Sequence, residues 1–100
     1  MRFQIDVVDP KAEIEALVAL GGFDSARVLE IGCGNGRLTF CYEHAARSVL
    51  AIDPSTQAIA KAKDRLRVES AARVRFEVGS ALELDLPPAS FDVALLSHSL

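Results

Sequence analysis

Hydrophobic and polar residues alternate along this chain in blocks that predict helices and strands in turn. Apolar residues recur at positions 14, 17, 18 and 20, behind Asp9 and Pro10 and ahead of Gly21 and Gly22. Asp caps a helix start, Pro suits the first helical turn, and Gly suits the residue beyond a helix end. The pattern therefore predicts a helix from residue 9 to residue 20.

Four short runs further along the chain predict strands. Residues 27–31, 48–53 and 91–96 are aliphatic-rich, and residues 74–78 alternate between apolar and polar. Helical spacing fills residues 37–46 and 54–66, the second behind Asp53 as predicted N-cap, and the Pro87-Pro88 pair marks residues 79–90 as a loop. This order predicts an α/β fold with a Rossmann-like, doubly wound parallel sheet and helices on both faces, truncated after the fourth strand.

Composition narrows the class of protein. Of the 100 residues, 50% are apolar and 25% charged, with a net charge of −3, which favours a folded domain. The charge provides no pull toward nucleic acid or a membrane surface, and the basic residues of 61–75 are interleaved with acidic ones. No run approaches the ~20 apolar residues of a membrane span. Cys33 and Cys41 form neither a disulfide framework nor a metal site, and we predict a reducing, cytoplasmic location.

The residues that follow the first two strands carry the candidate chemistry. Gly32, Gly34 and Gly36 form a GxGxG turn after Glu30. Glycines permit positive φ and let a ligand lie on the backbone. The spacing differs from the GxGxxG dinucleotide fingerprint, and the chain has no P-loop. Asp53 ends the second strand at the spacing expected of a carboxylate that binds ribose hydroxyls.

Four segments together resemble the class I S-adenosylmethionine-dependent methyltransferases. Residues 28–36 are similar to motif I of that family, and residues 51–55 to its acidic strand-two motif. Residues 79–87 are similar to its adenine-contacting loop, and residues 90–100 to its strand-four motif. The closest likeness is to the branch that methylates quinones, sterols and similar small molecules. The resemblance implies S-adenosyl-L-methionine as cofactor and a small-molecule methyl acceptor, with no metal, nucleic acid or membrane involved.

The resemblance also implies roles by position. Glu30 would help to hold the methionine ammonium, directly or through water, and Asp53 would bind the ribose hydroxyls. The remaining implied cofactor-binding residues follow the strands at one edge: Gly32, Cys33, Gly34 and Gly36 in the turn, Pro54 on the adenine face, Ser80 and Ala81 at the adenine edge, and Ser97 beside the methyl group. Ser80 stands where the family commonly has Asp, and a hydroxyl accepts hydrogen bonds less strongly than a carboxylate. No catalytic residue is assigned, and His98, just past the fourth strand, is the candidate.

Two other functions stay open on the sequence: a nicotinamide-dependent oxidoreductase fragment, and a non-catalytic chain that binds a cofactor or a partner. The resemblance implies that residues 1–100 form one partial S-adenosylmethionine-dependent methyltransferase domain, with an N-terminal helical segment at 1–22 and the cofactor-binding half at 27–100. The apolar strand at 91–96 would lie at an open sheet edge, where unpaired backbone groups favour self-association.

Overall fold

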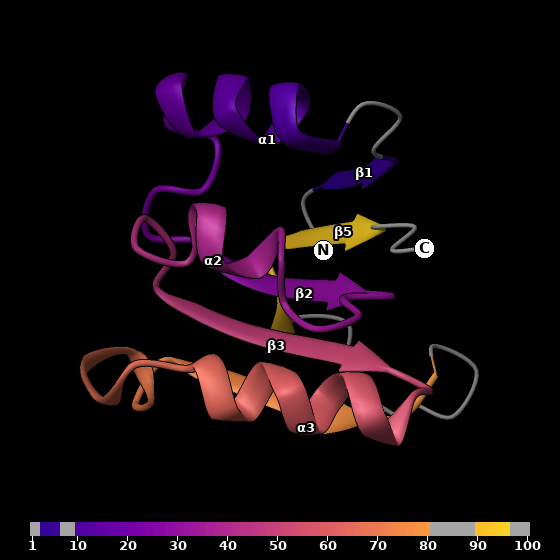
Figure 1. Cartoon of the computed structure of the whole chain (residues 1–100). Helices are drawn as coiled ribbons and strands as arrows, with labels where there is room; N and C mark the ends of the chain where they lie inside the picture. The colour runs from indigo at the N-terminus through magenta and orange to yellow at the C-terminus, as the bar shows by residue number, and fades with distance from the viewer. Residues whose placement is uncertain (1–2, 7–9, 81–89, 97–100) are drawn as a thin grey trace.

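Five parallel strands form one sheet in the computed structural model, which describes residues 3–6, 10–80 and 90–96. The strand order is β1-β5-β2-β3-β4. The strands are β1 (Phe3–Asp6), β2 (Arg27–Ile31), β3 (Ser48–Asp53), β4 (Val74–Val78) and β5 (Val93–Leu96). The helices are α1 (Pro10–Ala19), α2 (Thr39–Tyr42) and α3 (Thr56–Arg65), with a 3₁₀ turn η1 at Val68–Ser70 (Figure 1). The predicted Rossmann-like parallel sheet is confirmed.

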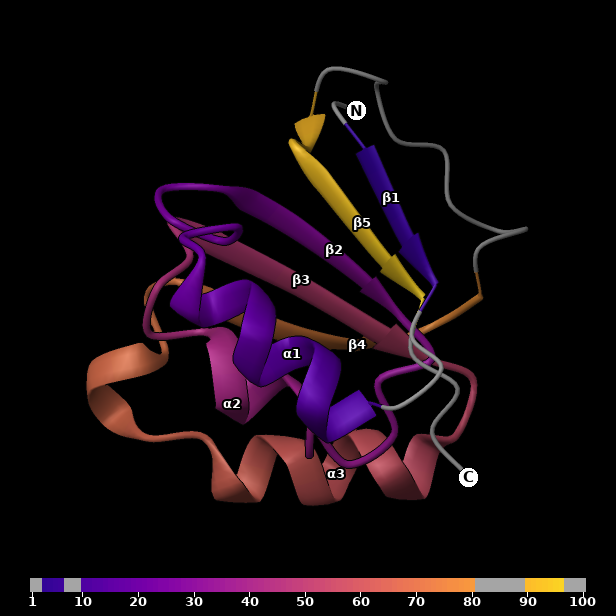
Figure 2. The ribbon, with the colours of Figure 1, turned by 90° about the horizontal axis from the view of Figure 1, so that it is seen from above.

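The three described helices lie on one face of the sheet, whereas the alternation predicted helices on both (Figure 2). The strand order explains the difference. From β1 to β2, from β2 to β3 and from β3 to β4, the chain advances across the sheet in one direction. Right-handed crossovers in one direction place their helices on the same face. Only the connection from β4 to β5 runs the other way, and its residues 81–89 lie outside the described part of the chain.

The sheet edge predicted to be open is occupied. Strand β5 pairs with β2 on one side and with β1 on the other, in the register Phe3 with Val93 through Asp6 with Leu96. The N-terminal segment, predicted to be helical, thus adds a fifth strand ahead of α1. The predicted association site on β5 is therefore wrong, because its backbone groups already pair with β1.

Helix α1 begins and ends close to the predicted residues. Gly21 has φ of +76°, and the Gly22 N–H donates to the Leu17 carbonyl at 2.8 Å. The Gly21 N–H donates to the Val18 carbonyl at 3.0 Å. These two bonds form a Schellman motif, in which a left-handed residue satisfies the last carbonyls of a helix.

Helices α2 and α3 differ from prediction in their ends. Only Thr39–Tyr42 of the predicted 37–46 is α-helical, because i→i−3 bonds such as that from Cys41 to Leu38 tighten the flanking turns. Helix α3 is capped by Ser55, whose Oγ accepts from the Ala58 N–H at 3.1 Å, and not by Asp53. The cap lies two residues later than predicted, and this leaves the Asp53 carboxylate for other partners.

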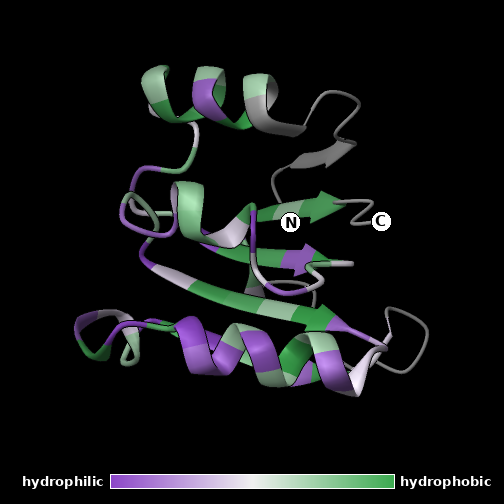
Figure 3. Ribbon diagram, in the orientation of Figure 1, coloured by the Kyte–Doolittle hydropathy of each residue, from purple (hydrophilic) through white to green (hydrophobic). Residues whose placement is uncertain are grey.

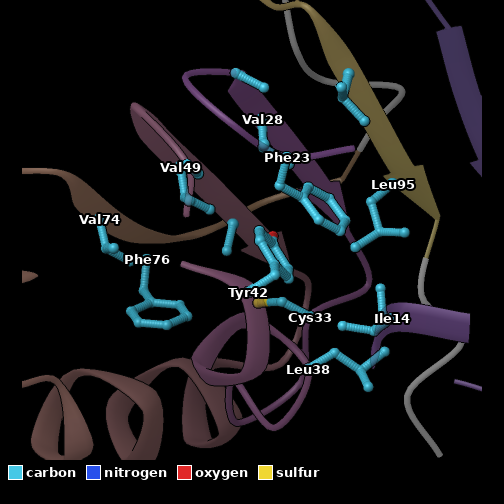
Figure 4. Close-up of a cluster of buried hydrophobic side chains, with 14 of the residues drawn as sticks. Ile14, Phe23, Val28, Cys33, Leu38, Tyr42, Val49, Val74, Phe76 and Leu95 are labelled. Atoms are coloured by element: carbon cyan, nitrogen blue, oxygen red, sulfur yellow. The ribbon is translucent and has the colours of Figure 1, made fainter. Parts of the chain in front are cut away.

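The hydrophobic core fills the space between the sheet and the helices (Figure 4). Phe23 and Tyr42 stack at its centre with ring centroids 4.4 Å apart. Strands β3 and β5 are largely hydrophobic, whereas α3 alternates hydrophobic and hydrophilic residues and β2 carries a hydrophilic band at Glu30, just before its last residue (Figure 3). No helix of the described residues is long and apolar enough to cross a bilayer.

Candidate functional site

The carboxyl ends of all five strands meet at one edge of the sheet, because the strands are parallel. The strand order reverses at β2. From β2 the chain continues to β3 and β4 on one side of it, and then returns to form β5 on its other side. Ligands of open α/β sheets bind at this kind of switch point. The glycine turn after β2 and the end of β3 lie here, since Ile31 pairs with Ile52. The edge is the candidate cofactor site.

The glycine turn has the backbone that its sequence predicts. Gly32, Gly34 and Gly36 have φ of +82°, +58° and +87°, a region that L side chains adopt at a cost. The N–H groups of Gly32 and Cys33 both donate to the Ile52 carbonyl, at 2.9 and 3.0 Å. The turn is therefore fastened to the end of the neighbouring strand β3.

Asp53 joins three loops at this edge. Its Oδ2 accepts from the Gly34 N–H and its Oδ1 from the Ser55 N–H, each at 2.9 Å. Its backbone carbonyl accepts from the Gly79 N–H at 3.0 Å, which brings in the loop after β4. The residue is 9% exposed and so nearly buried, with its Gly34 bond inside the protein and its Ser55 bond partly exposed. Each carboxylate oxygen retains acceptor capacity for a ligand hydroxyl, because a carboxylate offers about four lone-pair sites.

Gly36 is needed for packing as well as for its φ. A Cβ built there would lie 2.9 Å from the Phe40 ring and 3.0 Å from the Phe76 ring. These rings lie 5.7 Å apart, and Phe76 belongs to β4. The third glycine therefore lets the turn approach the sheet closely, in addition to the predicted role toward a ligand.

Glu30 lies deeper than its predicted role implies. Its side chain is fully buried, and its Oε1 accepts from Thr39 Oγ1 at 2.6 Å and from the Tyr42 hydroxyl at 2.8 Å. Both donors are buried residues of α2. Direct contact of Glu30 with a cofactor ammonium stays a prediction.

The Cys33 thiol is unreactive in this setting. Cys33 is 1% exposed and lies beside Tyr42 in the core (Figure 4). Burial, with the nearby charges of Glu30 and Asp53, raises the pKa of Cys33 to about 12. The thiolate is the nucleophilic form of cysteine, so Cys33 serves as a small filler of the turn.

The remaining predicted site residues are only partly described. Pro54 is exposed beside Asp53, and Ser80 is half-buried after β4. Ala81, Ser97 and the catalytic candidate His98 lie outside the described residues. The structure therefore brings Gly32, Cys33, Gly34, Gly36, Asp53, Pro54 and Ser80 to one edge, with Glu30 beneath it.

A hollow lies toward the opposite end of the sheet from the candidate cofactor site. It is an open groove between the last residues of α2 and α3, lined by Phe40, Glu43, His44, Arg65, Arg67 and Ser70. It is separate from the carboxyl edge, since α3 starts there and runs back toward the amino ends of the strands. Among the described residues, no cluster of His, Cys, Asp or Glu could hold a metal ion.

The sequence did not single out Thr39, Tyr42 and Ser55 as residues that shape this edge. Thr39 and Tyr42 bind the buried carboxylate, and Ser55 supplies both the cap of α3 and a backbone donor to Asp53. A usable signal was present, because a Glu within an apolar strand needs polar partners. Hydroxyl residues three apart on the next helix provide them on one face.

The geometry fits an adenosine-containing cofactor. A ribose presents two vicinal hydroxyls, and the Asp53 carboxylate lies between the glycine turn and the start of α3, beside the loop after β4. The turn itself presents backbone without a side chain at the half-buried Gly32. Neither feature requires a phosphate, which suits a nucleoside such as S-adenosylmethionine.

Comparison with known proteins agrees with this fit. The family model described as "Methyltransferase domain" matches residues 28–100. The chain is 40% identical over 76 residues to 27-O-demethylrifamycin SV methyltransferase of Amycolatopsis mediterranei, covering 74% of this chain and 28% of that protein. It is 37% identical over 71 residues to ribosomal RNA large subunit methyltransferase G of Streptomyces avermitilis, covering 69% of this chain and 18% of the relative. The chain thus spans less than a third of the length of these relatives.

A solved structure extends the likeness to the fold. The crystal structure of an S-adenosylmethionine dependent methyltransferase from Mesorhizobium loti superimposes with a TM-score of 0.68 at 30% identity. The match covers 90% of this chain and 41% of that protein. From the family match, the relatives and the shared fold, this chain belongs to the methyltransferase domain family, as a class I S-adenosylmethionine-dependent member.

Proposed function

We propose that this chain is the cofactor-binding part of a methyltransferase that transfers the methyl group of S-adenosylmethionine to a small molecule. The observation that carries the proposal is the placement of Asp53. Its carboxylate lies at the carboxyl edge, at the strand-order reversal, and links the glycine turn to the start of α3, while its backbone carbonyl binds the loop after β4.

The residues of the edge divide the cofactor among them in this proposal. Asp53 accepts hydrogen bonds from the ribose hydroxyls, and Gly32 and Gly34 let the methionine part lie against bare backbone. Pro54 packs on the adenine face, while Ser80 and Ala81 meet its edge and Ser97 lies on the side of the methyl group. When bound, the cofactor supplies an activated sulfonium methyl group. The protein then contributes alignment, which is worth up to ~7–11 kcal/mol in favourable cases.

A small-molecule acceptor is favoured over RNA. Of the two relatives named above, the one with the higher identity carries the name of a small-molecule methyltransferase. Three arginines of the described surface are also neutralised by ion pairs, Arg27 with Asp92, Arg73 with Glu43 and Arg75 with Glu77. Paired arginines add little to the attraction for a phosphate backbone.

The free thiols Cys33 and Cys41 support a reducing, cytoplasmic location.

Calorimetric titration with S-adenosylhomocysteine tests cofactor binding. We expect saturable binding, no binding of NAD, and at least about tenfold weaker binding in Asp53→Asn, because bonds to a charged acceptor are worth about 1.5–3 kcal/mol. Asp64→Asn is the matched control, since Asp64 is exposed on α3. Thermal melts verify that each variant folds. A folded chain that binds NAD, or that does not bind S-adenosylhomocysteine, would contradict the proposal.

The acceptor is tested separately, by transfer of a tritiated methyl group from the cofactor. The two substrates are an organic extract of small metabolites and purified ribosomal RNA. Label in the extract alone supports a small-molecule acceptor. Label in the RNA alone overturns that part of the proposal and leaves cofactor binding intact.

A further inference from the structure

Glu30 is a buried carboxylate with two hydroxyl donors. It is fully excluded from solvent in β2, and Thr39 Oγ1 and the Tyr42 hydroxyl donate to the same oxygen, Oε1, at 2.6 and 2.8 Å. Burying a carboxylate is costly unless hydrogen bonds compensate it. These short bonds show that the carboxylate is built into the core.

Tyr42 is held firmly in the position from which it donates. Its side chain is fully buried and stacks on Phe23 with an angle of 17° between the rings (Figure 4). Burial and the charge of Glu30 raise the pKa of Tyr42 well above its ordinary value. The hydroxyl therefore keeps its proton across the physiological range and remains a donor.

The two bonds connect the elements on either side of the glycine turn. Glu30 precedes the turn in β2, while Thr39 and Tyr42 follow it in α2. The other side of the turn is fastened to β3, through Ile52 and Asp53. With four residues, α2 has few internal bonds of its own to hold it in place. Its position therefore depends on what it is tied to.

We propose that Glu30 is a positioning residue, which sets the shape of the glycine turn by holding α2 through Thr39 and Tyr42, and does not contact the cofactor. This inference rests on the proposed function, because the effect is read as cofactor affinity. A cofactor ammonium would have to reach a side chain with no exposed surface and compete with two hydroxyl donors. The backbone of the turn, in contrast, lies at the edge where the cofactor would bind.

Two ligands separate positioning from direct contact. S-adenosylhomocysteine carries the amino acid part, whereas 5′-methylthioadenosine lacks it and keeps the adenosine. If Glu30 bound the ammonium, Glu30→Gln would weaken the first ligand only. If Glu30 positions the turn, Glu30→Gln weakens both ligands by a similar factor, because a neutral amide oxygen accepts from Thr39 and Tyr42 less strongly than the carboxylate does.

Variants of the donors test the same point without touching the carboxylate. Tyr42→Phe and Thr39→Val each remove one hydroxyl, and we expect each to weaken both ligands as Glu30→Gln does. Thr39→Ser keeps the hydroxyl, and we expect it to bind both ligands as the wild type does. The effects of Glu30→Gln and Tyr42→Phe should be less than additive in the double variant, because Glu30→Gln weakens the same hydrogen bond that Tyr42→Phe removes. Loss of S-adenosylhomocysteine binding alone in Glu30→Gln, with unchanged binding in Tyr42→Phe, would overturn the inference.

Amide hydrogen exchange distinguishes failure of this inference from failure of the proposed function. If the folded wild-type chain binds neither ligand, the proposed function fails. The positioning of the turn is then read from the exchange of the Gly32, Cys33 and Gly34 amides. We expect faster exchange at these amides in Tyr42→Phe and Thr39→Val than in Thr39→Ser, with exchange of the β3 amides unchanged. Equal exchange in all three variants would refute the positioning role.

Discussion

Gly36→Ala is expected to destabilise the fold strongly, and the structure allows its cost to be divided. The new Cβ would lie 2.9 Å from Phe40 Cε2, 3.0 Å from Phe76 Cζ and 3.2 Å from Phe76 Cε1. Phe76 is 3% exposed in β4, so its ring has little room to move. Overpacking of this kind costs about 1–3 kcal/mol. A non-glycine residue held at positive φ costs a further ~1–2 kcal/mol.

The expected loss is therefore about 2–5 kcal/mol of unfolding free energy. A domain of this size has about 5–15 kcal/mol in total, and each kcal/mol shifts Tm by about 4–8 °C. Thermal melts followed by circular dichroism, together with urea titrations, measure the loss. Gly79→Ala is the matched control, because a Cβ there meets nothing within 4 Å. Its φ is also outside the positive region.

A second substitution separates the two costs. Phe40 is half-buried, and Phe40→Leu in the Gly36→Ala background removes the ring that makes the shortest contact. We expect recovery of part of the steric cost and none of the cost of the positive φ, as a double-mutant cycle would report. The reasoning is refuted if Gly36→Ala unfolds within about 0.5 kcal/mol of the wild type, the range of ordinary surface changes.

Three further predictions concern pH and local contacts. Folding raises the pKa of Cys33 to about 12 and that of Tyr42 well above its ordinary value, so the folded state holds these protons more tightly than the unfolded state. The stability that this contributes is fully present below pH 9 and falls as the pH rises. Cys33→Ala should reduce this loss, as measured by urea titrations between pH 8 and 11. Asp92→Asn removes the charge that pairs with the exposed Arg27 guanidinium, and in thermal melts should lower Tm at low salt and lower it less at high salt; equal losses at both salt concentrations would contradict a charge effect. Ser55→Ala removes the cap of α3 and should cost about 1 kcal/mol, whereas Ser55→Asp should retain most of the stability in the same melts.

Local patterns in the sequence were sufficient for the strands and for the residues that follow them. The strands at 27–31, 48–53 and 74–78 are confirmed at the predicted bounds, and that at 91–96 begins two residues late. The glycine turn has positive φ at each predicted glycine, and Asp53 ends β3 beside it. Parallel order then brings these residues to one edge, because carboxyl ends of parallel strands coincide.

Long-range pairing was beyond the sequence pattern. Residues 3–6 carry too short a run to predict a strand. They form β1 because they pair with β5, where Phe3 lies opposite Val93, a residue ninety positions later in the chain. A strand of this length gains its stability from the sheet that it joins. The ends of two helices were beyond the sequence pattern for the same reason. The start of α3 depends on the bonds of the Asp53 carboxylate to Gly34 and Ser55, and the length of α2 depends on the turns on either side of it.

Local sequence patterns predict the order of elements, the glycine turn, the carboxylate at the end of β3 and the resemblance to methyltransferases, since each depends on residues close together in the chain. Three features are visible only in the folded chain: β1 closes the edge of β5, Gly36 packs against Phe76, and Glu30 is buried against Thr39 and Tyr42. These features depend on which side chains meet across the sheet and the helix layer. A carboxylate at a strand end has the same sequence pattern whether it faces a ligand or the core, and burial distinguishes the two.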